Sequence, residues 1–286
     1  MISKKENIYI SLVFLAICFL ATGGIFVKLS TLSPISTGLY RILFSLPLLY
    51  PFVRKNLKQI HLIDMLLMFF SGVFLALDLI FWNTSFSYTT VANANLLVNL
   101  VPITIIPLSY IFYKEKLNVN FFIGLIILSL GIIVLMNGKI IANPENFKGD
   151  MYAFIASIFY GLFLFSVSNA RKRVPAKVIM FVAGLGSLVT LFIAMVLTEG
   201  IQYPTSVKEV LPLIGLAIFS QLLGQGLMSY CVGKIRITLS SLLVLSQPVV
   251  AALYSFILFQ EKISLQEIGG IIIVLVGIYI SKKQST

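Results

Sequence analysis

Two ionisable side chains, Arg41 and Asp78, lie deep within long apolar stretches of the chain. A charge left unpaired in lipid costs several kcal/mol, from about 2.5 to more than 10 kcal/mol depending on the measure, so we expect both side chains to face the protein interior. There they could bind a polar or charged solute, and Asp78 could take up a proton during a coupled cycle. Alternatively, the two residues form a structural ion pair that joins their helices.

An aromatic residue accompanies the carboxylate. Asp78 shares one helical face with Trp82, one turn further along, and with Ser71 and Ser85, which lie two turns away on either side. An aromatic ring beside a carboxylate suits an organic solute, whereas Trp82 could instead pack against a neighbouring helix.

Amide side chains form two further polar stripes. Asn95 and Asn99 lie one turn apart, and Gln221 and Gln225 have the same spacing and are followed by Ser229. Buried amides either hydrogen-bond to neighbouring helices or line a wet cavity, and both interpretations stay open here. With two weaker polar positions on other helices, the candidate substrate-binding residues are Arg41, Asp78, Trp82, Asn95, Asn99, Tyr160, Gln221, Gln225 and Gln247.

These side chains need helices that lipid solvates. Of the 286 residues, 59% are apolar and only 11% are charged, and the mean hydropathy is +1.02, whereas soluble domains carry about 25% charged residues. Since a spanning helix needs about 20 mainly apolar residues, the sequence predicts an all-α integral membrane protein with ten transmembrane helices. They are predicted over residues 8–29, 34–53, 63–86, 90–112, 119–137, 150–170, 175–198, 209–232, 237–259 and 265–281.

The formal net charge of +11 has a topological explanation. The lysines and arginines lie in short groups between apolar runs and not in one surface stripe, which argues against nucleic-acid binding. With ten helices, most of these groups fall on the side of the N-terminus, as in cytoplasmic loops. We therefore expect a multi-pass protein of the plasma membrane with both termini in the cytoplasm.

The second half of the chain repeats the first. A shift of 146 residues, the distance from Pro102 to Pro248, pairs Ser109 with Ser255, Glu115-Lys116 with Glu261-Lys262, Gly124 with Gly270 and Gly131 with Gly277. We expect one five-helix unit over residues 1–140 and a second over 148–286. Because five is odd, the second unit enters the membrane upside down. Such inverted repeats give a carrier two conformations, open to opposite sides, with the solute site between the units.

Several helix ends carry signals of their own. Ser264 and Glu267 predict a capping box at the start of the last helix, and Asn118 can cap the fifth helix, so Glu115 and Glu261 are interpreted as architectural. Five prolines should interrupt helices, either as hinges and solute contacts or as static kinks. They are Pro47, Pro102, Pro107, Pro212 and Pro248.

One motif occurs in both units. Thr89 to Pro102 (TTVANANLLVNLVP), followed by Tyr113-Lys114-Glu115-Lys116-Leu117 and the glycine-punctuated helix with Gly124 and Gly131, resembles the EamA family of the drug/metabolite transporter superfamily. Ser246-Gln247-Pro248 through Phe259-Gln260-Glu261-Lys262-Ile263 to Gly277 resembles the same signature again. The resemblance implies ten helices, cytoplasmic termini and alternating access around a central cavity. It implies no particular solute, since similar proteins carry amino acids, purines, other metabolites or toxic compounds.

The sequence therefore predicts a secondary transporter for a small organic metabolite, such as an amino acid, a nucleobase or a related compound. A P-loop is absent, so the driving force is either proton coupling or plain facilitated diffusion. Its partners would be the solute and the bilayer, with the chain acting as a monomer or a homodimer.

Other functional classes fit the residues less well. The single histidine, His61, falls in a basic loop, and Cys18 and Cys231 lack metal-site spacing. We therefore expect no catalytic residues, metal or cofactor, and no enzyme. A channel or a membrane-embedded binding protein remains the alternative.

Overall fold

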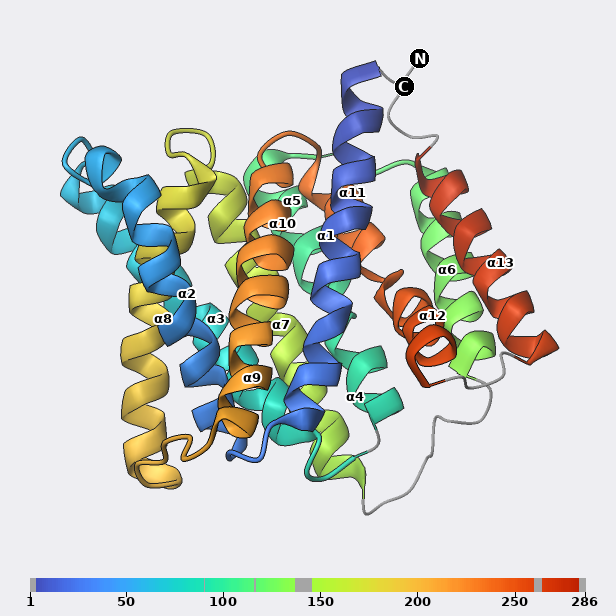
Figure 1. Cartoon of the computed structure of the whole chain (residues 1–286). Helices are drawn as coiled ribbons and strands as arrows, with labels where there is room; N and C mark the ends of the chain where they lie inside the picture. Colours follow the sequence, from blue (N-terminus) through green and yellow to red (C-terminus); the bar gives the residue numbers. More distant parts are fainter. Residues whose placement is uncertain (1–3, 90, 116, 137–145, 260–263, 283–286) are drawn as a thin grey trace.

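The computed structural model describes residues 4–89, 91–115, 117–136, 146–259 and 264–282, and all regular structure within them is helical (Figure 1). The segments are α1 (Lys4–Leu29), α2 (Pro34–Leu57), α3 (Leu62–Ser85), α4 (Val91–Val98), α5 (Pro102–Tyr113), α6 (Val119–Met136), α7 (Phe147–Ala170), α8 (Ala176–Thr198), α9 (Val207–Gly215), the π-helix η2 (Leu216–Gln225), α10 (Gly226–Cys231), α11 (Ile237–Val244), α12 (Gln247–Phe259) and α13 (Leu265–Lys282). In the described ranges they form ten rods, because α4 continues into α5, α9 into η2 and α10, and α11 into α12. The predicted all-α, ten-helix membrane fold is confirmed.

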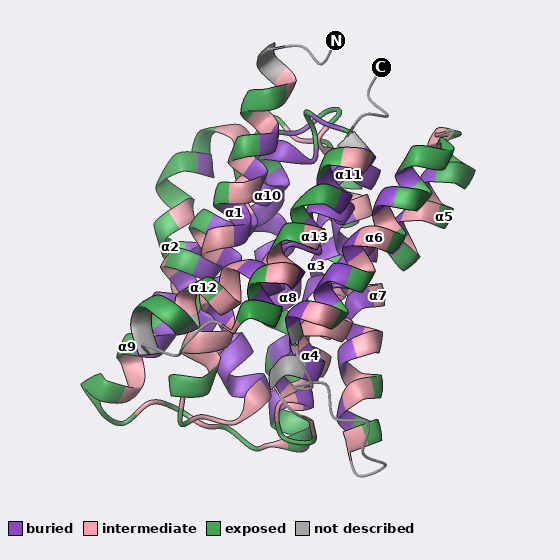
Figure 2. Cartoon of the chain, turned by 90° about the vertical axis from the view of Figure 1, so that its right-hand side faces the viewer, coloured by how far each residue is buried: buried purple, intermediate pink, exposed green. Residues whose placement is uncertain are grey.

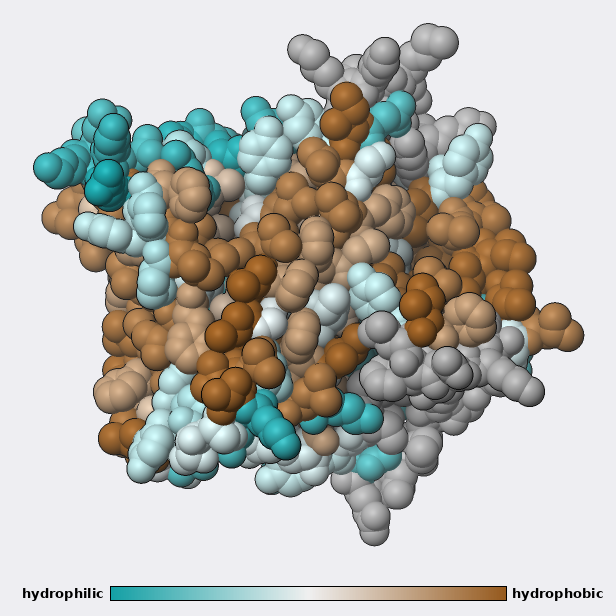
Figure 3. All heavy atoms as spheres, in the orientation of Figure 1, coloured by the Kyte–Doolittle hydropathy of each residue, from teal (hydrophilic) through white to brown (hydrophobic). Residues whose placement is uncertain are grey.

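Most rods are long and apolar enough to cross a bilayer. Within the described residues seven stretches meet this condition, and α6 and α13 form two shorter apolar helices. The α2 helix has 24 residues but is less apolar, since it carries Arg41 and the internal prolines Pro47 and Pro51. On the face drawn in Figure 3, apolar side chains form a band across the middle of the bundle, with hydrophilic residues toward its two ends. Such a band matches the hydrocarbon layer of a membrane.

The buried residues gather inside the bundle, around the middle helices (Figure 2). Every residue of α11 is buried, and α3 packs along both α7 and α8. Polar side chains on such central helices therefore face protein and not lipid.

The two units have matching helix boundaries. Two rods, α4–α5 and α11–α12, are broken into two half-helices, and the first half-helix ends at Val98 in one and at Val244 in the other. The last helix of each unit begins at Val119 and at Leu265. Both pairs are separated by the 146 residues of the sequence repeat. The α1 helix starts and α13 ends at the same end of the bundle (Figure 1), as ten crossings require.

Prolines explain the two breaks. Pro102 and Pro248 lack a backbone N–H and disfavour helical geometry in the residue before them, and each follows the gap in its rod. The predicted spans over 90–112 and 237–259 are present as the rods α4–α5 and α11–α12, and Pro102 and Pro248 interrupt them as expected. By contrast, Pro47, Pro107 and Pro212 lie inside α2, α5 and α9, which continue past them.

Two predicted caps are confirmed. The Ser264 backbone N–H donates to Glu267 Oε2 at 2.7 Å, and the Glu267 N–H donates to Ser264 Oγ at 3.2 Å, which is the reciprocal pattern of a capping box. The Phe121 N–H donates to Asn118 Oδ1 at 3.0 Å. Glu261 and Lys262 lie outside the described residues, whereas Glu115 accepts a hydrogen bond from Thr238 Oγ1 at 2.8 Å.

The repeated glycines hold α6 against α13. A Cβ atom on Gly131 would lie 2.7 Å from the backbone nitrogen of Val274, and one on Gly277 would lie 2.6 Å from that of Leu128. Glycine therefore allows the two backbones to approach, as small residues do at interfaces between membrane helices. The equivalent positions in the two units pack against each other, which explains their shared spacing.

Replacing Gly277 with alanine is expected to destabilise the protein by about 1–3 kcal/mol, the usual cost of overpacking. Gly269, on the same helix, is the matched control because a Cβ there would meet nothing within 4 Å, and Gly269→Ala should leave stability unchanged or slightly raised. The measurement is the temperature at which each purified variant loses its monodisperse size-exclusion peak. Equal temperatures for the two variants would contradict this account of the helix pair.

Candidate functional site

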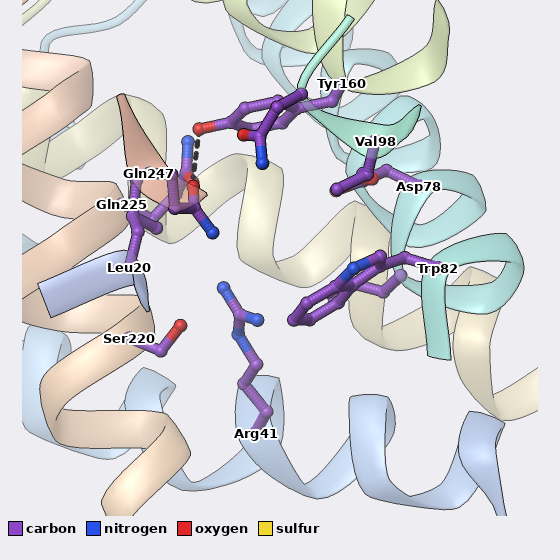
Figure 4. Close-up of a pocket in the computed structure, with 11 residues that line it drawn as sticks. Leu20, Arg41, Asp78, Trp82, Val98, Tyr160, Ser220, Gln225 and Gln247 are labelled. Carbon is purple, nitrogen blue, oxygen red and sulfur yellow. Dashed lines mark hydrogen bonds between the residues drawn. The ribbon is translucent and has the colours of Figure 1, made fainter. Parts of the chain in front are cut away.

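A cavity, here called the central cavity, lies between the two five-helix units (Figure 4). The space among its side chains totals about 420 Å³, of which only about 40 Å³ is wide enough for the centre of a water molecule. It is lined by Leu20, Arg41, Asp78, Leu79, Trp82, Val98 and Asn99 of the first unit and by Tyr160, Ser220, Gln225 and Gln247 of the second. Because one water needs about 10–15 Å³ of such space, the site is narrow in this conformation.

Arg41 reaches the cavity from α2. Its side chain is 4% exposed, and its Nε donates to Gln221 Oε1 on η2 at 2.9 Å. Figure 4 shows the guanidinium group pointing into the space between Trp82 and Gln225. Among the described residues, no carboxylate oxygen lies within 4.0 Å of the Arg41 nitrogens. The ion pair found in that part of the chain joins Arg173 and Asp64, away from the cavity.

The start of α2 is held by the second unit. The carboxylate of Glu199, directly after α8, accepts hydrogen bonds from the backbone N–H groups of Ile35 and Ser36 at 3.0 and 3.1 Å and from the hydroxyl groups of Ser33 and Ser36. A carboxylate at a helix N-terminus is favourable for both the free N–H groups and the helix dipole. This contact fixes the position of the helix that carries Arg41.

Asp78 and Trp82 enter from α3, as their spacing predicted. Asp78 is 7% exposed and Trp82 is 6% exposed, and the indole Nε1 is buried without a hydrogen-bond partner among the described residues. Ser71 and Ser85, on the same predicted face, donate to carbonyl groups of their own helix at 2.6 Å. The two serine hydroxyl groups are therefore bonded within α3, whereas the Asp78 carboxylate and the Trp82 ring reach the cavity.

The second unit contributes two hydroxyl groups, of Tyr160 and Ser220, and two amides, of Gln225 and Gln247. The Tyr160 hydroxyl donates to Gln225 Oε1 at 3.1 Å, and Gln225 Nε2 is buried without a partner in the described part of the chain. Gln247 is the first residue of α12, and Asn99 directly follows α4. Each of the two broken rods thus brings a side chain to the cavity at or beside its break.

Two candidate residues lie beside the cavity and not on its wall. Gln221 is buried and contacts Arg41 from behind, and Asn95 accepts a hydrogen bond on its backbone oxygen from Asn99 Nδ2 at 2.6 Å. The other seven candidates line the cavity: Arg41, Asp78, Trp82, Asn99, Tyr160, Gln225 and Gln247.

The π-helix changes which residues share a face. Its wider turn places Ser220 and Gln225, five residues apart, together on the cavity wall, whereas Ser229 donates to Met180 Sδ at 3.0 Å. The predicted stripe of Gln221, Gln225 and Ser229 is therefore not one surface. Long π-helical stretches are rare and often occur at functional sites.

Sequence reasoning missed four wall residues as candidates. Ser220 could have been predicted as a neighbour of Gln225 only if the π-helix, which places residues five apart on one face, had been expected. The other three are apolar residues without any distinguishing feature. They are Leu20, Leu79 and Val98.

The lining suits binding and not bond-making chemistry. Its hydrogen-bond donors include the guanidinium group, the indole N–H and the Gln225 amide, and Asp78 is the one carboxylate among the eleven wall residues. A nucleophile with a base, or a set of metal ligands, requires further acidic, histidine or cysteine side chains. Within the described residues no cluster of three metal-ligating side chains occurs.

Comparison with known proteins identifies the family. Residues 7–137 and 147–282 each match the EamA-like transporter family, so the match covers both units and most of the chain. The chain belongs to the EamA-like transporter family. This family is part of the drug/metabolite transporter superfamily, and the EamA-like chain is accordingly a multi-pass membrane transporter and not an enzyme.

Curated relatives of this EamA-like chain carry general names. A protein of Archaeoglobus fulgidus called "Uncharacterized transporter" is 29% identical over 231 residues, covering 78% of this chain and 79% of the relative. An "Uncharacterized transporter" of Haemophilus influenzae is 25% identical over 233 residues, covering 76% and 75%. A solved structure, titled "Crystal structure of protein", superposes with a TM-score of 0.79 at 17% identity over 97% of both chains, which shows the shared fold.

Proposed function

We propose that this EamA-like protein is a secondary transporter that moves a small organic metabolite across the plasma membrane by alternating access, with the central cavity as its solute site. Within the class of amino acids, nucleobases and related compounds, an amino acid best matches the charges on the cavity wall. One observation carries this choice: a buried arginine and a buried aspartate line one cavity, and neither forms an ion pair within 4.0 Å among the described residues.

The charges explain why a zwitterion suits the site. A buried charge without a partner is costly, and a hydrogen bond to a charged group contributes about 1.5–3 kcal/mol. The carboxylate of an amino acid could accept hydrogen bonds from Arg41 and from the N–H groups of Trp82 and Gln225, which have no partner among the described residues. An ammonium group could donate to Asp78. The solute would thus supply an oppositely charged partner to each buried charge, and the indole ring could contact the side chain of the solute.

Alternating access is supported by how the two units meet. We divide them at residues 1–140 and 148–286. Glu199 binds the start of α2 at one end of the bundle, and Thr238 of α11 binds Glu115, after α5, at the other. Since the cavity between them is too narrow for an amino acid, transport requires one set of contacts to open at a time. The matching breaks in the two discontinuous rods provide places for bending.

The orientation follows from the basic residues. Arg54 and Lys55 in the last turn of α2, and Arg171 to Arg173 between α7 and α8, lie at the end where α1 begins (Figure 1). Basic loops stay in the cytoplasm, so we place both termini there. All residues that line the central cavity belong to one chain, so the proposed solute site is complete whether the protein is a monomer or a homodimer.

The proposal is tested by binding and flux measured on the same protein. Trp82 is the single tryptophan of the chain and lines the cavity, so its fluorescence should change saturably when a solute binds. We expect this change, and flux into proteoliposomes, for amino acids of one side-chain class. Analogues that lack either the carboxylate or the amino group should bind at least tenfold more weakly, the effect of about 1.4 kcal/mol. Flux of a neutral nucleobase with none for any amino acid would overturn the assignment.

A further inference from the structure

A second hollow, here called the lateral groove, lies between α1, α2, α8 and the rod formed by η2 and α10. It has a volume of about 430 Å³, within the range of cavities that hold drug-sized ligands. Its residues are mostly apolar: Leu15, Phe19, Leu49, Ala176, Lys177, Met180, Gln221, Leu222, Leu223, Gly226, Leu227 and Tyr230. None of them lines the central cavity. The surface over α1 and α10 is mainly apolar in Figure 3, so the groove faces the lipid.

One end of the groove is basic and aromatic. Lys177 is exposed in the first turn of α8, and Tyr230 lies near the end of α10, with the Arg171 guanidinium carbon 5.6 Å from its ring centroid. Tyr9 packs against the same ring, with the two centroids 6.2 Å apart. Arg171 Nη1 donates to the Val174 backbone oxygen at 2.9 Å, whereas its buried Nε has no hydrogen-bond partner among the described residues. Cationic and aromatic side chains of this kind are typical of the level of lipid headgroups.

The inner part of the groove reaches the solute site through one side chain. Gln221 lines the groove, and its Oε1 accepts the hydrogen bond from Arg41 Nε at 2.9 Å. The amide thus separates a space that lipid can enter from the guanidinium group that faces the central cavity.

We propose that the lateral groove binds one acyl chain of an anionic phospholipid, whose headgroup is held by Lys177 and Arg171, and that the bound chain keeps Gln221 against Arg41. Charge complementarity selects this occupant, because an apolar channel with a cationic rim matches an acyl chain below a phosphate. An empty groove leaves Gln221 free to turn outward, and Arg41 then loses its hydrogen-bond acceptor. The effect on flux rests on the proposed transport function, whereas lipid binding is measurable without it.

Headgroup charge, and not the acyl chain, should decide which lipid is retained. Any phospholipid offers an acyl chain, whereas each basic residue near an anionic surface favours binding about fivefold, which corresponds to about 1 kcal/mol. Lys177→Gln should therefore lower the preference for phosphatidylglycerol over phosphatidylcholine about fivefold. Lys208→Gln is the matched control, since Lys208 is exposed in the first turn of α9, at the opposite end of the bundle.

Gly226 offers a way to fill the groove. A Cβ atom there would meet only the Gln221 backbone oxygen, at 3.9 Å, so a longer side chain can enter the groove without striking backbone. Gly226→Leu should occupy the place of the acyl chain and abolish retention of the lipid.

The experiment uses the full-length chain in nanodiscs of phosphatidylcholine with equal phosphatidylglycerol, followed by native mass spectrometry of co-purified lipid. We expect retained phosphatidylglycerol for the parent and Lys208→Gln, about fivefold less for Lys177→Gln, and none for Gly226→Leu. Equal retention of both lipids by the parent, or unchanged retention in Gly226→Leu, would overturn the proposal. Flux measured with and without phosphatidylglycerol tests the regulation: the parent should respond and Gly226→Leu should not. Lipid retention without any solute flux would instead count against the transport assignment alone.

Discussion

The Arg41→Ala variant is expected to transport its solute at least 100-fold more slowly than the parent, judged by initial flux at low solute concentration in proteoliposomes. The guanidinium group is the one cationic side chain on the cavity wall, so its loss leaves a solute carboxylate without a charged partner in a buried site. Truncating one member of a buried charged pair costs about 2–5 kcal/mol, and each 1.4 kcal/mol is a factor of ten. The loss also deprives Gln221 Oε1 of its donor.

Two further variants make this result specific. Arg41→Lys keeps the charge but not the planar array of N–H groups, so it should recover part of the flux. Arg54→Ala removes an exposed arginine near the end of the same helix and should transport like the parent. All three proteins must first elute as monodisperse peaks after purification. Parental flux in a well-folded Arg41→Ala protein would show that the guanidinium group does not contact the solute.

Strong local signals made much of the fold predictable. The cost of charge in lipid is large enough that Arg41 and Asp78 had to face the interior, whatever the packing around them. The repeat also paired the glycines of α6 and α13, and the structure adds that these equivalent positions meet at one interface. These features can be read from the sequence because each depends only on a residue type and its position in the chain.

The finer geometry of the site depends on tertiary context that a single sequence does not reveal. Both proline interruptions were expected, as hinges or as static kinks, but the spacing of Asn95 and Asn99 suggested one common face. In the structure Asn99 and Gln247 reach the wall, while Asn95 stays one turn back. The π-helix has no compositional signature, so the α-helical spacing of Gln221, Gln225 and Ser229 suggested one surface where the structure has three different environments. Whether Arg41 and Asp78 form the alternative ion pair also depends on packing, and in the described part of the chain no ion pair within 4.0 Å joins them.

Asp78→Asn is expected to lower flux of a zwitterionic solute at least tenfold and to remove any effect of a pH gradient on the remaining flux. Asparagine has nearly the same shape as aspartate but carries no charge and takes up no proton. Asp78 is the one carboxylate on the cavity wall, so both the contact with an ammonium group and any proton coupling depend on it. The measurement compares solute accumulation in proteoliposomes with and without an imposed pH gradient. Asp64→Asn, at an intermediate-burial position in the first turn of α3, is the control and should behave like the parent.

The double variant Arg41→Gln with Asp78→Asn separates a solute site from a structural ion pair. If the two charges mainly stabilised each other, removing both would restore most of the thermal stability and flux lost in each single variant, because no uncompensated charge would remain. If each charge instead binds its own part of the solute, the double variant should be stable but at least as inactive as the worse single variant. We expect the second result, because in the part of the chain that the structure describes no ion pair within 4.0 Å joins the two groups, and two donors without a partner there, Trp82 Nε1 and Gln225 Nε2, belong to wall residues of the same cavity. The coupling energy from this double-mutant cycle measures the pair directly, and recovery of flux in the double variant would exclude a zwitterion bound between Arg41 and Asp78.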